Sequence, residues 1–324
     1  MCTICTWTGS GQGVFTFRNM DWAAGDMPSN VWVIPRGVER VAALPQDPNP
    51  MKWTSKYGSV GTQIFDIGTG DGMNETGLHA AILYLAPSDY GPRNPELPAI
   101  SVTEWVEYYL DNFASVAEAV EATNATPYQI VSMDVEKTPA VLHLHLADAT
   151  GDAAVIEFMD AKMDIYHGQQ CQILTNLPPF PQQLDNLKNY EVYGGDLPLP
   201  GTTASPDRFV RAHFYRDGMP KAANREQAIE YMRGIAQNVA QPFGTVSKYR
   251  EMVAPTLWRS LSDHTNLIYY YEDSAHPSEV WLDFKNLDFA PGAPAMTIPP
   301  KNVDFKVGEQ SANLVPKEPH FQLL

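Results

Sequence analysis

The chain begins Met1-Cys2-Thr3-Ile4-Cys5, and removal of Met1 leaves Cys2 as the first residue. An N-terminal cysteine carries a thiol nucleophile and an α-amine on one residue. An α-amine has an ordinary pKa of about 7.7–8.0, so it can act as a base near neutral pH. A free cysteine is also among the residue types most often buried for packing alone. We therefore interpret Cys2 as a catalytic thiol only if the surrounding residues supply charge and hydrogen bonds.

Two charged residues follow at a spacing that a β-hairpin would return to Cys2. The apolar runs 2–8 and 14–18 are separated by Gly9-Ser10-Gly11-Gln12-Gly13, which is typical of a hairpin turn. The second run continues into Arg18-Asn19-Met20-Asp21-Trp22, so the hairpin would bring Arg18 and Asp21 beside Cys2. A solvated turn that carries an Arg and an Asp is the common alternative.

Two polar residues later in the chain also suggest a site. Asn176, in Thr175-Asn176-Leu177-Pro178-Pro179, closes a strand just before two prolines. Asn is usually a turn residue there, but its amide can donate a hydrogen bond to a substrate. Arg208 lies in the first turn of a helix that we expect to begin with Ser205 as cap and Pro206 as first helical residue. The helix dipole disfavours a cation there, which indicates that Arg208 has a local partner or a role in the interior of the protein.

A non-catalytic alternative uses the same cysteines, because Cys2 and Cys5 have the C-x-x-C spacing of zinc sites and redox dithiols. A structural zinc needs two more ligands, yet Cys171 stands alone and His143-x-His145 has the spacing of one strand face. A redox dithiol should open a helix, whereas a turn follows Trp7. A metal or redox protein, or a binding module on the same fold, remains the alternative to an enzyme.

Composition limits the class of protein and its partners. The 324 residues are 44% hydrophobic and 19% charged, enough for a sizeable core, and the net charge is −16. An acidic chain without clustered Lys and Arg argues against nucleic acid as a partner. No run approaches the ~18 apolar residues of a membrane span. No leader pattern precedes Cys2. We expect a cytoplasmic location if Met1 is the native start, and a periplasmic one if a leader has been removed.

The remaining pattern predicts the elements that position these residues. Period-two or apolar runs predict strands at 31–35, 62–67, 78–85, 130–133, 141–146, 153–158, 171–175, 256–260, 267–271 and 280–284. Capping signals predict helices from Ser101, Ser115, Ser205 and about Arg225. The runs between 130 and 175 read as one antiparallel meander. This order predicts a layered α+β protein, and the absence of a linker favours one domain over 1–324, with 291–324 wrapping the surface.

Together these motifs resemble the choloylglycine hydrolase family, which includes penicillin V acylases and conjugated bile salt hydrolases. The resemblance spans nearly the whole chain and rests on the Cys2 start and on segments 18–22, 53–60, 71–78, 175–178 and 207–212. It implies an N-terminal nucleophile hydrolase fold, a four-layer αββα sandwich of two antiparallel sheets. It also implies cleavage of a non-peptide amide without a cofactor or a metal, on a small-molecule substrate, by a homo-oligomer, in this family a tetramer.

The resemblance also assigns roles to individual residues. Cys2 matches the nucleophile of the family, and Arg18 and Asp21 match the pair that supports its thiolate and α-amine. Asn176 matches a donor of the oxyanion hole, and Tyr84 matches the position whose backbone N–H completes that hole. Arg208 matches the active-site arginine. A guanidinium favours a nearby thiolate, and fixed donors stabilise a developing oxyanion. Cys5 has no place in the pattern, so we give it a packing role.

The substrate follows less directly. Tyr84 stands where penicillin V acylases of the family carry an aromatic residue and bile salt hydrolases an asparagine, and Met20 and Trp22 extend an apolar wall beside the charged pair. Aromatic walls suit a phenoxyacetyl group or a flexible acyl chain better than a hydroxylated steroid. We therefore expect a penicillin V acylase-like amidase that also accepts N-acyl homoserine lactones, with conjugated bile salt hydrolase as the alternative.

Overall fold

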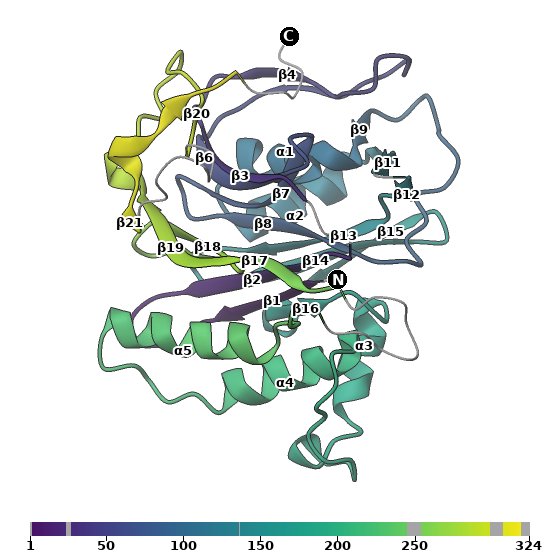
Figure 1. Ribbon diagram of the computed structural model, residues 1–324. Helices are drawn as coiled ribbons and strands as arrows, with labels where there is room; N and C mark the ends of the chain where they lie inside the picture. The colour runs from purple at the N-terminus through teal and green to yellow at the C-terminus, as the bar shows by residue number, and fades with distance from the viewer. Residues whose placement is uncertain (1, 24–26, 136, 245–253, 299–306, 319–324) are drawn as a thin grey trace.

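The computed structural model describes residues 2–23, 27–135, 137–244, 254–298 and 307–318. Two large sheets lie face to face, and helices cover the outer face of each (Figure 1). Within the described residues, one sheet has seven strands and the other nine, and we call them sheet I and sheet II. This arrangement confirms the predicted four-layer α+β sandwich.

Sheet I contains the N-terminal hairpin and the last long strands of the chain. Its order is β16-β1-β2-β17-β18-β19-β21, and every pair is antiparallel except β19 with β21. The strands are β1 (Cys2–Trp7), β2 (Phe15–Asp21), β16 (Ile173–Thr175), β17 (Thr256–Asp263), β18 (Ile268–Asp273), β19 (His276–Asp283) and β21 (Gly308–Glu309).

Sheet II has the order β15-β14-β13-β8-β7-β6-β3-β20-β22. Its strands are β3 (Ser29–Ile34), β6 (Ser59–Ile64), β7 (Gly68–Asn74), β8 (His79–Tyr84), β13 (Leu142–Ala147), β14 (Ala153–Met159), β15 (Lys162–His167), β20 (Met296–Thr297) and β22 (Val315–Pro316). Short pairs lie outside it: β4 (Glu39–Val41) with β5 (Lys52–Thr54), β9 (Ala99–Ser101) with β10 (Gln129–Val131), and β11 (Asp134–Val135) with β12 (Thr138–Pro139).

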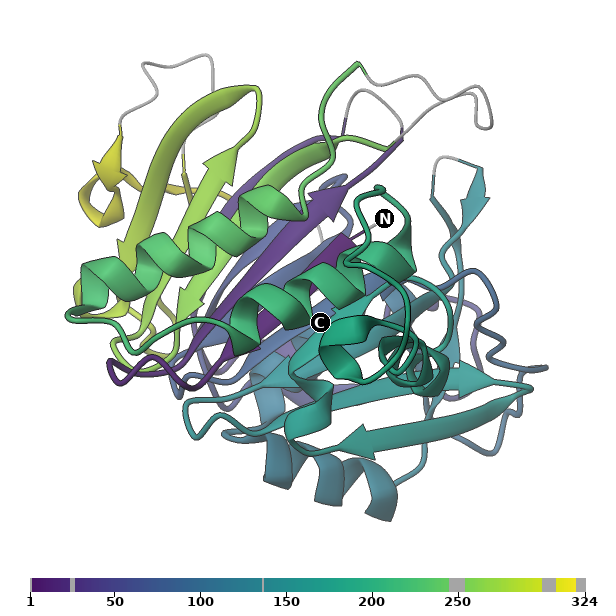
Figure 2. The same ribbon diagram turned by 90° about the horizontal axis from the view of Figure 1, so that it is seen from below.

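The helices form the two outer layers. On sheet II lie α1 (Trp105–Asn112), after a 3₁₀ turn at Val102–Glu104, and α2 (Val116–Ala125); on the other side lie α3 (Phe180–Leu187), α4 (Ser205–Asp217) and α5 (Arg225–Asn238). Figure 2 shows α4 and α5 lying across the face of sheet I. The aromatic stripe of α1 is buried against sheet II, as the sequence predicts. None of the helices in the described ranges has the length and apolar character needed to cross a membrane.

The register of the first hairpin decides which side chains share a face. Cys2 pairs with Met20 and Ile4 with Arg18. Because side chains alternate along a strand, Cys2, Arg18 and Met20 point into the space between the sheets. Cys5 points to the opposite face, toward α4, whose Arg216 and Asp217 influence its thiol. The hairpin therefore places Arg18 next to Cys2, as predicted.

Three predictions about the elements are wrong. The run 171–175 leaves the meander: its first two residues lie in a 3₁₀ turn, and Ile173–Thr175 form β16 beside β1 in sheet I. Gln129–Val131 pairs with β9 outside both large sheets. Local periodicity carries no information about which sheet a strand joins. Ser205 is the first helical residue of α4, not its cap, because its hydroxyl accepts from the Leu177 N–H and donates to Thr175.

The C-terminal stretch 291–324 does more than wrap the surface. In its described parts, β20 and β22 extend sheet II beyond β3, while β21 extends sheet I beyond β19. Residues 299–306 and 319–324 lie outside the described residues, as does Met1. The short pairing runs explain why this stretch showed no strand pattern in the sequence.

Candidate active site

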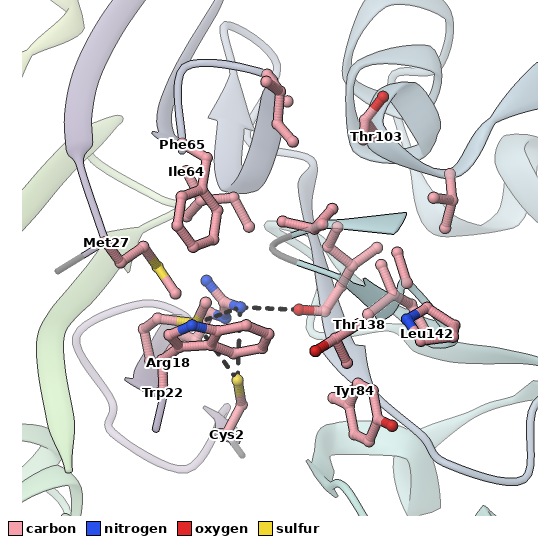
Figure 3. A pocket seen from close by; sticks show the side chains of 18 residues that line it. Cys2, Arg18, Trp22, Met27, Ile64, Phe65, Tyr84, Thr103, Thr138 and Leu142 are labelled. Carbon is pink, nitrogen blue, oxygen red and sulfur yellow. Dashed lines mark hydrogen bonds between the residues drawn. The ribbon is translucent and has the colours of Figure 1, made fainter. Parts of the chain in front are cut away.

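The Cys2 thiol lies at the start of β1, between the two sheets, and Cys2 is only 3% exposed. Arg18 Nη2 lies 3.6 Å from Cys2 Sγ and 3.2 Å from Met20 Sδ, and it donates to the Ile82 carbonyl at 2.8 Å (Figure 3). The guanidinium also lies over the Trp258 ring, 4.9 Å from its centroid. Arg18 is therefore fixed with its guanidinium beside the thiol.

The main chain of Cys2 is held from the other side of the strand by Arg208. This fully buried side chain donates to the Cys2 carbonyl at 2.5 Å, to the Thr3 hydroxyl, and to Asn176 Oδ1 at 3.1 Å. Burial lowers the pKa of Arg208, and the charge of Asp21 offsets part of this effect. Arg208 thus has the local partners and the role in the interior that its position in the first helical turn indicated.

Asp21 lies on the Arg208 side of the hairpin, so Arg18 and Asp21 are not an ion pair with each other. The Asp21 carboxylate accepts hydrogen bonds from Thr256 Oγ1 at 2.6 Å and Gln241 Nε2 at 2.7 Å, and lies 3.7 Å from Arg208 Nη1. Residues three apart on a strand point to opposite faces. Arg18 therefore serves the thiol side of Cys2, and Asp21 lies on its backbone side.

Asn176, which follows β16, links the backbone of Cys2 to β8. Its Oδ1 accepts from the Cys2 N–H at 2.5 Å, and its Nδ2 donates to the Tyr84 carbonyl at 2.8 Å. The N–H and C=O of one strand residue point to the same edge. The Tyr84 N–H therefore faces the same side as the carbonyl that Asn176 binds. The structure brings together the amide group and the backbone N–H that the sequence predicted as neighbours.

A mostly apolar pocket opens in front of the Cys2 thiol (Figure 3). The space in and in front of this pocket, open solvent included, is about 680 Å³. Met20, Trp22 and Tyr84 line it, as predicted from sequence, and the Trp22 ring lies edge-on to Phe65 with centroids 6.1 Å apart. Thr103 and Thr138 also line it. Such a pocket suits an apolar acyl or aryl group placed next to the thiol.

Several residues of the site escaped the sequence reasoning. Thr256 and Gln241 hold Asp21, and the pocket wall also includes Met27, Ile64, Phe65, Ile67, Val102, Val135 and Leu142. These residues come from turns and strands that are distant in sequence, and no local motif marks them. Among these residues only Thr256 stood at a recognisable place in the sequence, the start of a predicted strand, and that strand pairs with the end of β2.

The geometry does not support the C-x-x-C alternative. Cys2 and Cys5 lie on opposite faces of β1, and burial raises the pKa of the Cys5 thiol to about 12. His143 contacts Glu157 at 2.8 Å, and His145 binds the Cys171 carbonyl at 3.0 Å, so both have structural partners. Among the described residues, no group of three or more His, Cys, Asp and Glu side chains could hold a metal ion.

Comparison with known proteins decides the family. The model of the linear amide C–N hydrolases of the choloylglycine hydrolase family matches residues 2–292. The chain belongs to this family. Among other members, a penicillin V acylase from Pectobacterium atrosepticum is 38% identical over 297 residues, covering 85% of this chain and 78% of that protein. A bile salt hydrolase/transferase from Clostridium perfringens is 30% identical over 326 residues, covering 89% and 94%.

Solved structures of choloylglycine hydrolase family members share the fold. The structure of penicillin V acylase from Agrobacterium tumefaciens superimposes with a TM-score of 0.89 at 38% identity, covering 100% of this chain and 99% of that one. A conjugated bile acid hydrolase from Clostridium perfringens gives a TM-score of 0.77 at 25% identity, covering 93% and 97%. These comparisons confirm the predicted family, the N-terminal nucleophile hydrolase fold and the reaction class, hydrolysis of linear amide C–N bonds.

Proposed function

We propose that this amide hydrolase uses Cys2 as an N-terminal nucleophile and is an acylase of the penicillin V type. One observation carries the proposal: the Cys2 thiol faces an apolar pocket with the Arg18 guanidinium 3.6 Å away, while Asn176 and Arg208 hold the backbone of the same residue. The other two described thiols, Cys5 and Cys171, are less suited to this role, because burial raises their pKa values to about 12.

The reaction proceeds through a thioester. The Cys2 thiolate attacks the amide carbonyl, and the α-amine passes a proton to the leaving amine as the C–N bond breaks. Water then attacks the thioester, which releases the carboxylic acid and restores the thiol. This chemistry requires removal of Met1, because a Cys2 nitrogen within a peptide bond cannot accept a proton. Arg208 and Asp21 orient the new α-amine from the backbone side of Cys2.

The oxyanion of the tetrahedral intermediate is bound by Asn176 Nδ2 and the Tyr84 N–H. The support for this assignment is the 2.8 Å hydrogen bond between Asn176 Nδ2 and the Tyr84 carbonyl, together with the bond from the Cys2 N–H to Asn176 Oδ1, which brings both groups next to Cys2. Donors that are fixed before the reaction stabilise the charge that develops on the carbonyl oxygen.

The tetrameric assembly expected from the family remains a prediction.

The pocket favours a phenoxyacetyl or long acyl group over a conjugated bile salt. Its wall combines aromatic rings from Trp22, Phe65 and Tyr84 with aliphatic side chains such as Ile64 and Leu142. Ring contacts add about 0.5–1.5 kcal/mol beyond area burial, whereas each unpaired steroid hydroxyl would lose its water. Bile salts stay the competing substrate class, because a bile salt hydrolase/transferase is 30% identical to this chain.

We predict that kcat/KM is higher for penicillin V and for long-chain N-acyl homoserine lactones than for glycine- and taurine-conjugated bile salts. Hydrolysis of the three classes should be measured under one set of conditions. Tyr84→Leu keeps the backbone N–H but removes the ring, so kcat/KM for penicillin V should fall about 2- to 10-fold. Tyr215→Leu, on α4 and outside the pocket, is the matched control. A conjugated bile salt in first place would transfer the assignment to bile salt hydrolysis.

A further inference from the structure

The Arg18 guanidinium uses only part of its hydrogen-bonding capacity. Nη2 makes the contacts with Cys2, Met20 and Ile82, while Nε and Nη1 have no hydrogen-bond partner among the described residues, although Arg18 is 1% exposed. A buried cation with unpaired donors is costly unless an opposite charge or bound water lies nearby. The surroundings of the unpaired Nη1 therefore indicate where a compensating group belongs.

One of these donors, Nη1, lies against β7. A Cβ atom added to Gly70 would lie 3.3 Å from Arg18 Nη1, so this nitrogen lies against the backbone of β7 at the residue before Asp71. Gly70 has no side chain to fill this space. The guanidinium is thus confined between the Trp258 ring on β17, the Ile82 carbonyl on β8 and the backbone of β7.

Asp71 is a fully buried carboxylate in the same space between the sheets. It accepts hydrogen bonds from Tyr269 of sheet I at 2.6 Å and from His79 of sheet II at 2.8 Å. Burial opposes its ionisation, but the charge and hydrogen bond of His79, the charge of Arg18 and the Tyr269 hydroxyl together lower the pKa of Asp71 below its usual range. Asp71 is therefore an anion close enough to Arg18 to interact with it, without direct ion-pair contact.

We propose that Asp71 is a positioning residue of the amidase reaction: its carboxylate holds the Arg18 guanidinium against β7, through bridging water, and shares the positive charge that Arg18 presents to Cys2. This inference rests on the proposed role of Cys2. Two polar groups separated by more than a hydrogen bond, each with free capacity, form the kind of site that buried water occupies. Tyr269 and His79 hold the Asp71 carboxylate from both sheets, so its electrostatic attraction for the Arg18 guanidinium has a fixed direction.

This arrangement has a consequence of definite sign for Cys2. The negative charge of Asp71 disfavours a thiolate, and it neutralises part of the guanidinium charge that favours one. Without Asp71 the thiolate would form at lower pH, and it would be a weaker nucleophile because it is more strongly stabilised. The charged and titratable groups that face this region are Arg18 on β2, the thiol and α-amine of Cys2, His79 on β8, Tyr269 on β18, and His145 and His264 next to His79.

Asp71→Asn tests the proposal directly, because the amide keeps the shape of the carboxylate and removes its charge, while its single oxygen still accepts from one of Tyr269 and His79. The rate of Cys2 alkylation by iodoacetamide, measured against pH, should show its acid limb about one pH unit lower than in the wild type. For a substrate, kcat should fall about 10- to 100-fold while KM changes little, since the pocket wall is untouched. Glu157→Gln is the matched control, because Glu157 and His143 form another buried pair at 2.8 Å in sheet II.

A stability cycle tests the same coupling without any catalysis. Asp71→Asn and Arg18→Met should each lower the unfolding midpoint, and the double variant should unfold no earlier than Asp71→Asn alone, because removal of both charges leaves none uncompensated. If Asp71→Asn cannot be obtained folded, recovery of folded protein in the double variant supports the proposal, and failure of the double variant beside a folded Arg18→Met contradicts it.

Two results would overturn the inference. One is an Asp71→Asn variant with the wild-type alkylation profile or with the same shift as Glu157→Gln, since either would reduce Asp71 to a structural role. The other is strict additivity of the two stability losses. Neither readout depends on turnover, so a wrong assignment of the nucleophile would show in the activity of Cys2 variants and not here.

Discussion

Replacement of Cys2 by alanine is expected to lower turnover by about a millionfold, the usual cost of removing a nucleophile. The change removes one sulfur from a buried site whose other contacts are made by the backbone, so folding should change little. Met1 still precedes a small residue in this variant. Hydrolysis of penicillin V by purified Cys2→Ala, with a circular dichroism spectrum equal to that of the wild type, is the measurement.

Cys5→Ala is the control for this result. Cys5 lies on the same strand, is equally buried and faces the helical layer instead of the pocket. Its loss should lower the free energy of unfolding slightly and leave kcat/KM near the wild-type value. Loss of activity in Cys5→Ala together with full activity in Cys2→Ala would reverse the assignment and favour a dithiol mechanism.

Asn176→Ala is expected to lower kcat by about 100- to 1,000-fold, because one of two oxyanion donors is lost. The same change removes the acceptor for the Cys2 nitrogen and for Arg208, so the nucleophile also loses part of its orientation. Steady-state kinetics with penicillin V should show the loss mainly in kcat, since the pocket wall does not include Asn176.

The control for Asn176→Ala is Asn224→Ala. Asn224 caps α5 by accepting from the Gln227 N–H at 2.9 Å, and its loss should cost about 1 kcal/mol of stability without a change in kcat. If both variants lost activity in proportion to their loss of stability, Asn176 would be a structural residue and the oxyanion assignment would be wrong.

The parts of the site that the sequence predicted are those set by local chain geometry. A glycine-rich turn between two apolar runs defines a hairpin, and the hairpin register alone brings Arg18 beside Cys2. Capping and periodicity likewise located α1, α2, α4 and α5 but not α3, and the order of the elements indicated layered sheets. The positions of Asn176 and Arg208 relative to Cys2 depend on contacts 174 and 206 residues apart, and the motif resemblance, not periodicity, linked them.

The parts that escaped prediction depend on packing between sheets. β16 resembles the preceding strands of the meander in composition, yet it pairs with β1 and so belongs to sheet I. The contact of Asp71 with Tyr269 spans 198 residues and crosses from one sheet to the other, so no sequence pattern announces it. The pocket wall is similar: Phe65 and Leu142 are ordinary apolar residues until the fold places them on opposite sides of one pocket.

The central claim is that catalysis begins at an N-terminal Cys2 that becomes acylated. Intact-mass spectrometry of active enzyme, quenched with acid during turnover of a slow amide substrate, tests it most directly. We predict a protein that lacks the mass of Met1 and carries the mass of one acyl group, which peptide mapping places on Cys2. A homogeneous, fully active preparation that retains Met1, or an acyl group mapped to another residue, would contradict the account.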